Sequence, residues 1–438
     1  MTLKSLLSHS IEAYTATRSD TRPADAVLAD YLRARKYLGS HDRKFISETV
    51  YGTLRQDLSI ESFIHHALPQ TSNALTYALT IFLFLSPQRF DELLIPLTEL
   101  TAFSKESLSD LHTRFLSKQA TATRLSDRYA FPEWVTEALR VDFSETDLAH
   151  LYAALNTEAP LTLRANTLLT SRDALKQTLA SEHIATTFGD LSPDALLCDR
   201  RRPIFQSQCF KQGLCEIQDE GSQLISILLN PKPKTITLDA CAGGGGKTLH
   251  LATLMQNKGK VYAYEKFPKR FGNIRDRLKR SSLQNVEILD GDDKLRRFRE
   301  KFSGKVDNIL LDAPCTGSGT LRRNPDLKRR LTLESLERIK IVQSEILDDY
   351  APMLKTGGRL VYATCSIFRE ENEAQVDAFL SRNPNFSRLP VSQVVAEINI
   401  DADLTNLCER LQNQTYLKLF PHLDNTDGFF AAVLTRLS

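Results

Sequence analysis

The sequence predicts a multidomain protein made of an all-helical N-terminal domain (1–130), a small α/β module (131–230) and a Rossmann-like α/β domain (231–438). Three observations support this fold class. The 438 residues suffice for about three domains of ordinary size. No glycine lies between Gly52 and Gly189, in a region rich in Leu, Ala and Arg. From residue 235 onward, short apolar runs alternate with helix-like segments, a pattern typical of a buried parallel sheet.

Composition places the chain among ordinary globular proteins, with 42% apolar and 25% charged residues. Its net charge is only +2, so affinity for nucleic acid would have to come from local basic patches. The N-terminus lacks the apolar core of a secretory signal, and no apolar run is long enough to span a membrane. We therefore expect a cytoplasmic protein.

The cysteines are odd in number and scattered, and no pair has CxxC spacing. Neither a zinc site nor a disulfide framework is indicated, and no metal is expected. Reduced, mostly structural thiols are expected of a cytoplasmic protein. The seven are Cys198, Cys209, Cys215, Cys241, Cys315, Cys365 and Cys408.

In the helical domain, apolar residues at helical spacing predict a helix over 24–38, with Gly39 as its C-cap. A second helix starts from Ser40 or Asp42. The run LTYALTIFLFL (75–85) is apolar almost all round and predicts a buried core helix.

The α/β module is predicted from a strand and turn over 159–171 and an amphipathic helix after it. Candidate strands follow at 185–188 and 195–198, and a helix over 214–230 leads into the last domain. Alternation in the first strand places Arg164 on the face opposite to Leu163. Arg164, with Arg200, Arg201 and Arg202, would let the module sit on RNA, although a structural spacer explains the same pattern.

The C-terminal domain shows a regular alternation of strand and helix signals, closed by two strands around an Asn-Thr-Asp-Gly turn. The predicted strands are 235–240, 260–264, 286–289, 306–312 and 358–364, and the predicted helices are 247–257, 268–280, 332–354 and 369–380.

Polar residues gather where these strands end, which in an open α/β sheet is where ligands bind. Asp239 and a glycine cluster follow the first strand, and Glu265 follows the second. Asp312 with Cys315 follows the fourth strand, and Cys365 follows the fifth.

The loop 241–247 (CAGGGGK) resembles the end of a phosphate-binding P-loop, but Cys241 stands where that motif requires glycine. The remaining interpretation is a glycine loop at a helix N-terminus that lets the backbone approach a ligand closely. Glu265, about 20 residues further on, suits the ribose diol of a nucleoside cofactor. A purely structural glycine turn is the alternative.

Two cysteines at neighbouring strand ends indicate covalent catalysis by a thiolate with a second assisting group. A nucleophilic thiolate needs access and a lowered pKa, and Lys247 with the nearby helix N-termini would supply positive potential. The alternative is that both thiols are buried as small apolar groups.

Several motifs together resemble the NOL/NOP2/Sun family of RNA 5-cytosine methyltransferases, and the paired Pro-Cys and Thr-Cys motifs are the most specific. Within the family, the chain looks like the bacterial ribosomal small-subunit methyltransferase B (Sun or Fmu) type, because HDRKFISETVYGTLR resembles the RNA-binding domain of NusB-type factors. The other motifs are LDACAGGGGKT, DGD (290–292), LLDAPCTGSG, NPD (324–326), GGRLVYATCS, EEN (370–372) and TDGFF (426–430).

The resemblance implies a class I methyltransferase domain that uses S-adenosylmethionine to methylate cytosine C5 in RNA, and 16S rRNA is the expected substrate of this chain. It implies Cys365 as the nucleophile, Cys315 as the residue that helps to release product, and Asp312 beside cofactor and base. Glu265 would hold the ribose and Asp292 the adenine region. The carboxypropyl end would lie on Cys241, Ala242, Gly243, Gly244, Gly245, Gly246 and Lys247.

The glycine loop departs from the family pattern, which usually has Ala-Pro where this chain has Gly243 and Gly244. Because proline fixes φ, the loop is expected to be more flexible before binding. The contacting groups of the loop remain.

RNA contacts are predicted for a basic cluster that directly follows the Cys315 loop, and a monomer is expected to bind small-subunit rRNA. The cluster comprises Arg322, Arg323, Lys328, Arg329 and Arg330. Three rival functions are the same chemistry on tRNA, a non-catalytic RNA-binding factor and a nucleotide hydrolase. Intact Cys315 and Cys365 argue against the second, and the missing P-loop glycine argues against the third.

Overall fold

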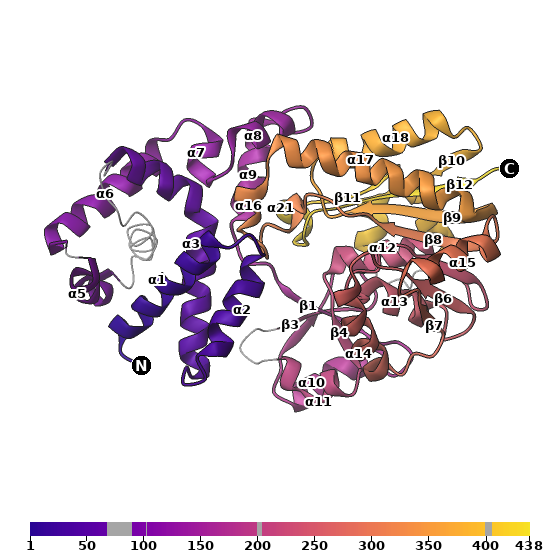
Figure 1. Ribbon diagram of the computed structural model, residues 1–438, viewed down its shortest axis with the longest axis horizontal. Coiled ribbons are helices and arrows are strands. Elements are labelled where there is room, and N and C mark those ends of the chain that lie inside the picture. The colour runs from indigo at the N-terminus through magenta and orange to yellow at the C-terminus, as the bar shows by residue number, and fades with distance from the viewer. Residues whose placement is uncertain (68–89, 102, 199–203, 399–404) are drawn as a thin grey trace. The chain divides into compact units, whose positions relative to one another are not determined.

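A computed structural model describes residues 1–67, 90–101, 103–198, 204–398 and 405–438. The chain forms two compact units: residues 1–158 with 320–333, and residues 159–319 with 334–438 (Figure 1). The helix predicted over 75–85 and the arginines at 200–202 lie outside the described residues. The domain boundaries predicted near 130 and 230 stay a prediction.

The first unit is helical, as predicted, around a core that includes Leu7, Ile46, Leu97 and Phe115. Its helices are α1 (Leu3–Ser19), α2 (Ala24–Ala34), α3 (Ser40–Ala67), α5 (Phe90–Thr101), α6 (Lys105–Thr121), α7 (Leu125–Tyr129), α8 (Glu133–Leu139), α9 (Glu145–Leu155) and α16 (Leu327–Arg330).

Helix α2 ends at Ala34, four residues before the end predicted from the apolar spacing. The Arg43 guanidinium donates to the backbone carbonyls of Leu32 (2.8 Å), Arg35 (3.1 Å) and Leu38 (3.0 Å). A side chain from α3 therefore satisfies the carbonyls at this C-terminus. The Arg43 side chain thus closes the end of α2.

The small module begins the second unit with an antiparallel sheet in the order β2-β3-β1-β4. It contains β1 (Leu161–Ala165), α10 (Arg172–Ser181), β2 (Thr186–Phe188), β3 (Ala195–Cys198), α11 (Gln208–Lys211) and β4 (Cys215–Ile217). The helix predicted over 214–230 is wrong at its start, because Cys215–Ile217 pairs with β1 as a strand. Helix α12 (Glu220–Leu229) follows, capped by Asp219.

The second sheet of this unit has the order β10-β12-β9-β8-β5-β6-β7, with β11 paired to β12. Strands β5 to β9 pair in parallel, and β12 runs antiparallel to β9. The strands are β5 (Ile236–Asp239), β6 (Lys260–Ala263), β7 (Val286–Ile288), β8 (Val306–Asp312), β9 (Leu354–Thr364), β10 (Phe386–Leu389), β11 (Leu417–Leu419) and β12 (Phe429–Arg436). The predicted parallel α/β sheet and its strand positions are therefore confirmed.

Helices connect and cover this sheet (Figure 1). They are α13 (Gly246–Leu254), α14 (Phe271–Ser281), α15 (Asp292–Phe302), α17 (Leu333–Tyr350), α18 (Glu373–Arg382), α19 (Val391–Glu397), α20 (Thr405–Leu411) and α21 (Pro421–Asp424). The two closing strands are joined through α21 rather than by a tight turn. In the described part of the chain, no helix is both long and apolar enough to cross a membrane.

Candidate active site

Two cysteine loops leave neighbouring strands at the same edge of the sheet. Strands β8 and β9 are parallel, with Asp312 in register with Ala363. The loop after β8 carries Cys315 and the loop after β9 carries Cys365, so the pairing brings both thiols together. Their sulfur atoms are 3.3 Å apart, and both residues are half-buried free thiols.

A buried carboxylate, Glu371, ties the two loops to each other. Its Oε1 accepts from the Thr316 backbone N–H (2.8 Å) and from Gln343 Nε2 (3.0 Å). Its Oε2 accepts from the hydroxyls of Thr316 (2.6 Å) and Ser366. Burial raises the pKa of Glu371, while these hydrogen bonds oppose that rise. Each cysteine is thus next in sequence to a residue bound by Glu371.

Further hydrogen bonds fix the second loop. Asn372 accepts from the Thr364 hydroxyl (2.5 Å) and donates to the Ser366 carbonyl (3.0 Å). The Gly319 N–H donates to the Cys365 carbonyl at 2.9 Å. The sequence drew attention to 370–372 only as a family motif, and the structure shows that these residues organise the two thiols.

Lys247 and Asp312 form an ion pair beside the thiols, with Nζ 2.7 Å from Oδ2. The side chains are 12% and 30% exposed. Burial by itself lowers the pKa of Lys247, but Asp312 outweighs burial and the Cys365 sulfur adds to its effect, so the pKa lies above its ordinary value. The Lys247 ammonium therefore remains charged close to Cys365.

The glycine loop turns sharply between β5 and α13. Gly243 and Gly245 have φ values of +54° and +84°, a region that favours glycine over any other residue. Glu265, which is 6% exposed, accepts from the N–H of Gly243 (2.9 Å) and of Phe267 (2.9 Å). The acid at the end of the second strand thus also holds the glycine loop.

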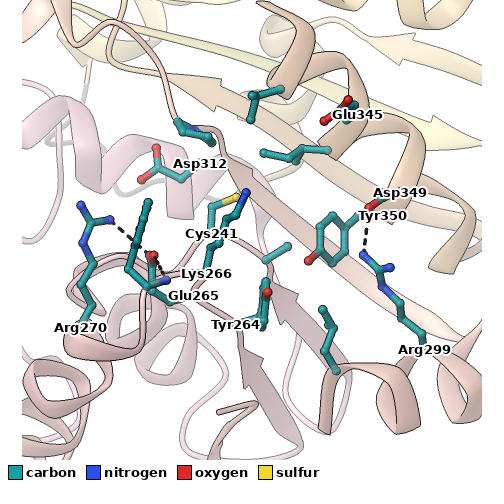
Figure 2. Close-up of a pocket in the computed structure, with 16 residues that line it drawn as sticks. Cys241, Tyr264, Glu265, Lys266, Arg270, Arg299, Asp312, Glu345, Asp349 and Tyr350 are labelled. Atoms are coloured by element: carbon teal, nitrogen blue, oxygen red, sulfur yellow. Dashed lines mark hydrogen bonds and ion pairs between the residues drawn. The ribbon is translucent and has the colours of Figure 1, made fainter. Parts of the chain in front are cut away.

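A cavity of about 390 Å³ opens beside this loop (Figure 2). It is bounded on one side by Glu265, Lys266 and Asp312, and on the other by Tyr264, Arg299 and Tyr350. Burial raises the pKa of Cys241, so this thiol stays neutral in the wall. The remaining lining residues are Ala240, Phe267, Arg270, Leu295, Pro314, Val342, Glu345, Ile346 and Asp349.

Helix α17 supplies part of this wall, which the sequence interpretation missed. Val342, Glu345, Ile346 and Asp349 recur at helical spacing on the cavity side. That periodicity was a usable signal, because one helix face combines apolar and acidic residues. Asp292, expected near adenine, is exposed at the start of α15 and does not line the cavity; Leu295 and Arg299 of that helix do.

Asp239 provides a test of whether the site fits a cationic ligand. It is fully buried, and Oδ2 accepts from the Thr248 hydroxyl at 2.6 Å. Oδ1 has no hydrogen-bond partner among the residues that the structure describes, and burial raises the pKa of Asp239 to about 7. A buried acceptor without a partner is costly unless a ligand satisfies it. The amino group of S-adenosylmethionine is a suitable donor.

Comparison with models of known protein families identifies the family of this chain. A model described as "16S rRNA methyltransferase RsmB/F" matches residues 226–435. A second model, "Methyltr_RsmF/B-like, ferredoxin-like domain", matches residues 131–205. The chain belongs to the RsmB/F family of 16S rRNA methyltransferases.

Relatives of the RsmB/F family cover most of the chain. The ribosomal RNA small subunit methyltransferase B of Vibrio vulnificus is 33% identical over 310 residues, 70% of this chain and 67% of that protein. The protein of the same name in Vibrio cholerae is 28% identical over 422 residues, 92% of each chain. The predicted family and the predicted B type are therefore confirmed.

Two solved structures share the fold. The crystal structure of PH0851 has a TM-score of 0.78 and 25% identity, and covers 100% of this chain and 99% of that one. NSun6 from Pyrococcus horikoshii, solved with SFG, has a TM-score of 0.60 and 22% identity over 70% of this chain and 99% of that one. The predicted three-part fold is confirmed, with the middle module being ferredoxin-like.

As a member of the RsmB/F family, the chain is an S-adenosylmethionine-dependent rRNA methyltransferase that acts at cytosine C5. This agrees with the predicted reaction and enzyme class, and it favours rRNA over the tRNA, non-catalytic and hydrolase alternatives. Within the described residues, no group of three or more His, Cys, Asp or Glu side chains could hold a metal ion.

The basic cluster predicted to bind rRNA phosphates is placed differently by the structure. Arg322 is 6% exposed and Lys328 only 2% exposed. Lys328 Nζ donates to the carbonyls of Arg55 (2.8 Å) and Tyr129 (3.3 Å) and to Asn156. Phosphate contact by these two side chains is contradicted, because the helical unit encloses them.

The neighbours of Lys328 also have partners in the helical unit. Arg329 pairs with Asp57 and Glu61, and Arg330 with Asp326. Segment 320–333 thus folds with the N-terminal helices although it follows the Cys315 loop, which belongs to the other unit. RNA contact remains a prediction for Arg323, Arg329 and Arg330.

Arg164 was also predicted to face RNA, and that prediction is wrong. The side chain is 2% exposed and donates to Gln218 and to the Gly246 carbonyl (2.9 Å). The expected exposure of Arg164 is not found because both faces of β1 are covered, as its burial pattern shows.

Proposed function

We propose that this chain methylates a 16S rRNA cytosine through a covalent bond between Cys365 and C6 of the base. The observation that carries this proposal is the approach of Cys365 to Cys315, 3.3 Å between sulfurs, beside Lys247 and Asp312 and next to the cavity wall. Two thiols that follow the carboxyl ends of neighbouring strands supply a nucleophile and a second group for product release.

Methylation through this covalent bond proceeds by addition, methyl transfer and elimination. The Cys365 thiolate forms a bond to C6, and the electron pair of the C5=C6 double bond moves to C5. Carbon C5 then bonds to the methyl group while the bond between that methyl group and its sulfur breaks, and the electron pair of the broken bond stays on the sulfur as a neutral thioether. Loss of the C5 proton to a base restores the double bond while the S–C6 bond breaks and the thiolate returns. When bound, S-adenosylmethionine supplies an electrophilic methyl group on a positively charged sulfur.

The environments of the two thiols support their different roles. The hydrogen bond to Cys365 is the main cause that raises the pKa of Cys315 well above its ordinary value, and burial adds to it. Cys315 therefore starts as a neutral thiol. The Lys247 ammonium lies close to Cys365, which is the electropositive setting that a nucleophilic thiolate needs.

Asp312 is proposed to orient the base. Its Oδ2 bonds Lys247, and its side chain remains 30% exposed at the cavity wall. A carboxyl group in this position has acceptor capacity left for the exocyclic amino group of cytosine. To reach it, the cytosine must leave its stack, at a cost of a few kcal/mol.

The cofactor is proposed to occupy the cavity of about 390 Å³. Glu265 would accept from the ribose hydroxyls, and Asp239 Oδ1 from the ammonium group. The N–H groups of Gly246 and Lys247, at the N-terminus of α13, would receive the carboxylate end. NSun6 from Pyrococcus horikoshii was solved with SFG, which supports a small-molecule site on this fold.

The partner is proposed to be small-subunit rRNA, bound by a monomer in the cytoplasm. The names of the Vibrio relatives support the substrate.

The experiment uses methyl-labelled S-adenosylmethionine with unmodified 16S rRNA and, separately, unmodified tRNA. After digestion, we expect labelled 5-methylcytidine from rRNA alone. Label from tRNA alone would overturn the target, and another labelled nucleoside would overturn the reaction. Assembled small subunits form a third arm, and no label in any arm would contradict the proposal.

A further inference from the structure

The glycine loop 241–247 contains no proline to restrict its backbone, so a restraint on its conformation must come from contacts outside the loop. Gly243 and Gly244 have no side chain and gain much conformational freedom when the loop is released. The carbonyls of this loop are nonetheless bound from outside. Two arginines, Arg277 and Arg164, donate to them.

Arg277 reaches the loop from α14. Its Nη1 donates to the Gly244 carbonyl at 2.8 Å. Its Nε donates to Glu216 Oε2 at 3.1 Å, and Arg280 pairs with the other oxygen of the same carboxylate. Glu216 is 2% exposed on β4 of the ferredoxin-like module. The guanidinium is therefore fixed at both ends, on the loop and on the module.

Arg164 reaches the loop from the module itself. On β1 it lies in register with Glu216 of β4, and its Nη1 donates to the Gly246 carbonyl at 2.9 Å. Burial lowers the pKa of Arg164 to about 10, which reflects the cost of enclosing a cation. Such a cost suggests that the contact has a use beyond packing.

A third contact joins the ferredoxin-like module to the helix that follows the glycine loop. Asp194 precedes β3 of the module, and its Oδ2 lies 3.3 Å from Nε2 of His250 on α13. Helix α13 begins at the glycine loop. The module therefore touches the loop and the helix that the loop starts.

Because a peptide group is planar, holding a carbonyl also orients the N–H of the next residue. Arg277 on Gly244 sets the N–H of Gly245, which closes the turn by donating to the Ala242 carbonyl at 2.8 Å. Arg164 on Gly246 sets the N–H of Lys247, in the first turn of α13, where backbone donors have no helical partner.

We propose that Arg277 and Arg164 are positioning residues for S-adenosylmethionine, because their hydrogen bonds restrain the glycine loop. The ferredoxin-like module thereby becomes part of the cofactor site. This inference rests on the proposed role of the loop in cofactor binding, so its test must separate the two.

The test is titration calorimetry of the full-length protein with S-adenosylmethionine in the absence of RNA. Arg277→Met is expected to weaken binding about tenfold, as for the loss of one hydrogen bond from a charged group. Arg164→Lys is expected to do the same while keeping a charge. Lys279→Met, on the exposed side of the same helix, is the matched control and should bind like wild type.

Rescue distinguishes positioning from general damage. Gly244 has a φ outside the positive range, and an added Cβ would meet only Arg277 Nη1, at 3.5 Å. No described backbone carbonyl accepts from its N–H. Neither a clash nor a lost backbone hydrogen bond therefore opposes proline, and we expect Gly244→Pro in the Arg277→Met background to restore affinity to within about twofold of wild type.

Each outcome decides one of the two proposals. If both arginine variants bind within about twofold of wild type while Glu265→Ala loses binding, the positioning role is overturned and the cofactor site stands. If wild type does not bind, or Glu265→Ala binds normally, both fail. Weak binding by Arg277→Met that proline does not rescue, in a protein with unchanged circular dichroism, also overturns the positioning role.

Discussion

The sulfur atoms of Cys315 and Cys365 lie 3.3 Å apart although the two residues are 50 positions apart in the sequence. The parallel pairing of β8 with β9 brings the loops together, and Glu371 joins them. Each cysteine and the carboxylate between them can be tested separately.

Replacing Cys365 by alanine removes the proposed nucleophile. Methyl transfer is expected to fall by about a thousandfold or more, because the thiolate proposed to add to C6 is lost. Binding of S-adenosylmethionine should survive, since Cys365 does not line the cavity. Tritium release from C5-labelled rRNA measures the turnover. Cys198→Ala, in the ferredoxin-like module, is the thiol control, and normal turnover by Cys365→Ala would remove its role.

Replacing Cys315 by alanine should trap the enzyme on its substrate. Without the second thiol, breakdown of the Cys365–C6 adduct is slowed, so a covalent protein–RNA species accumulates. Denaturing gels with labelled rRNA detect it. The Cys315→Ala, Cys365→Ala double variant should show no adduct; an adduct there, or none in the single variant, contradicts the assignment.

Removing the Glu371 carboxyl should separate the two cysteine loops. Glu371→Ala leaves the Thr316 N–H and several other donors without an acceptor, and we expect unfolding free energy to fall by about 2–4 kcal/mol, with loss of most activity. Glu371→Gln is the matched control. Its amide can face the hydroxyls of Thr316 and Ser366, which can rotate to accept, so a small effect is expected.

Urea unfolding and single-turnover rates would be measured on both Glu371 variants. Equal damage from alanine and glutamine would show that charge, rather than the pattern of acceptors, maintains the loops.

His250 predicts a pH dependence of stability. Burial lowers its pKa to about 4, from an ordinary value of 6.5, and Arg164 contributes. Between these values the unfolded chain binds a proton that the folded protein does not, so stability falls as the pH decreases from 6.5 towards 4. The full effect is about 3 kcal/mol.

The measurement for His250 is urea unfolding at several pH values between 4 and 7, compared between wild type and His250→Gln. The variant should lack this loss of stability at low pH. Asp239, whose pKa is raised to about 7 by burial, acts in the opposite direction, because it favours the folded state at low pH. The difference between the two proteins cancels that effect, and parallel curves would contradict the prediction.

Lys328 tests the correction to the predicted RNA surface. Lys328→Met leaves the carbonyls of Arg55 and Tyr129 without this donor, and we expect unfolding free energy to fall by about 2–4 kcal/mol. The rRNA affinity of the folded protein and its salt dependence should not change. Lys105→Met, exposed at the start of α6, should alter neither. A smaller salt slope for Lys328→Met would restore Lys328 to the RNA interface.

Much of the site was predictable because it lies where strand signals end. Asp239, Glu265, Asp312, Cys315 and Cys365 each follow an apolar run, and in a parallel sheet such ends meet at one edge. The family motifs lie in the same places. These features are local in the sequence, and they sufficed to predict the fold, the reaction and the positions of the two thiols.

The amino-acid sequence was thus enough to predict the parallel sheet, the two thiols at its edge and the methyltransferase family. Which charged residues are buried became known from the three-dimensional structure. Arg164, Lys328 and Glu371 have hydrogen-bond partners far away in the sequence. The residue type is the same whether the charged side chain faces water or a buried hydrogen-bond partner. Burial and hydrogen bonding depend on long-range packing, which residue type and spacing do not encode.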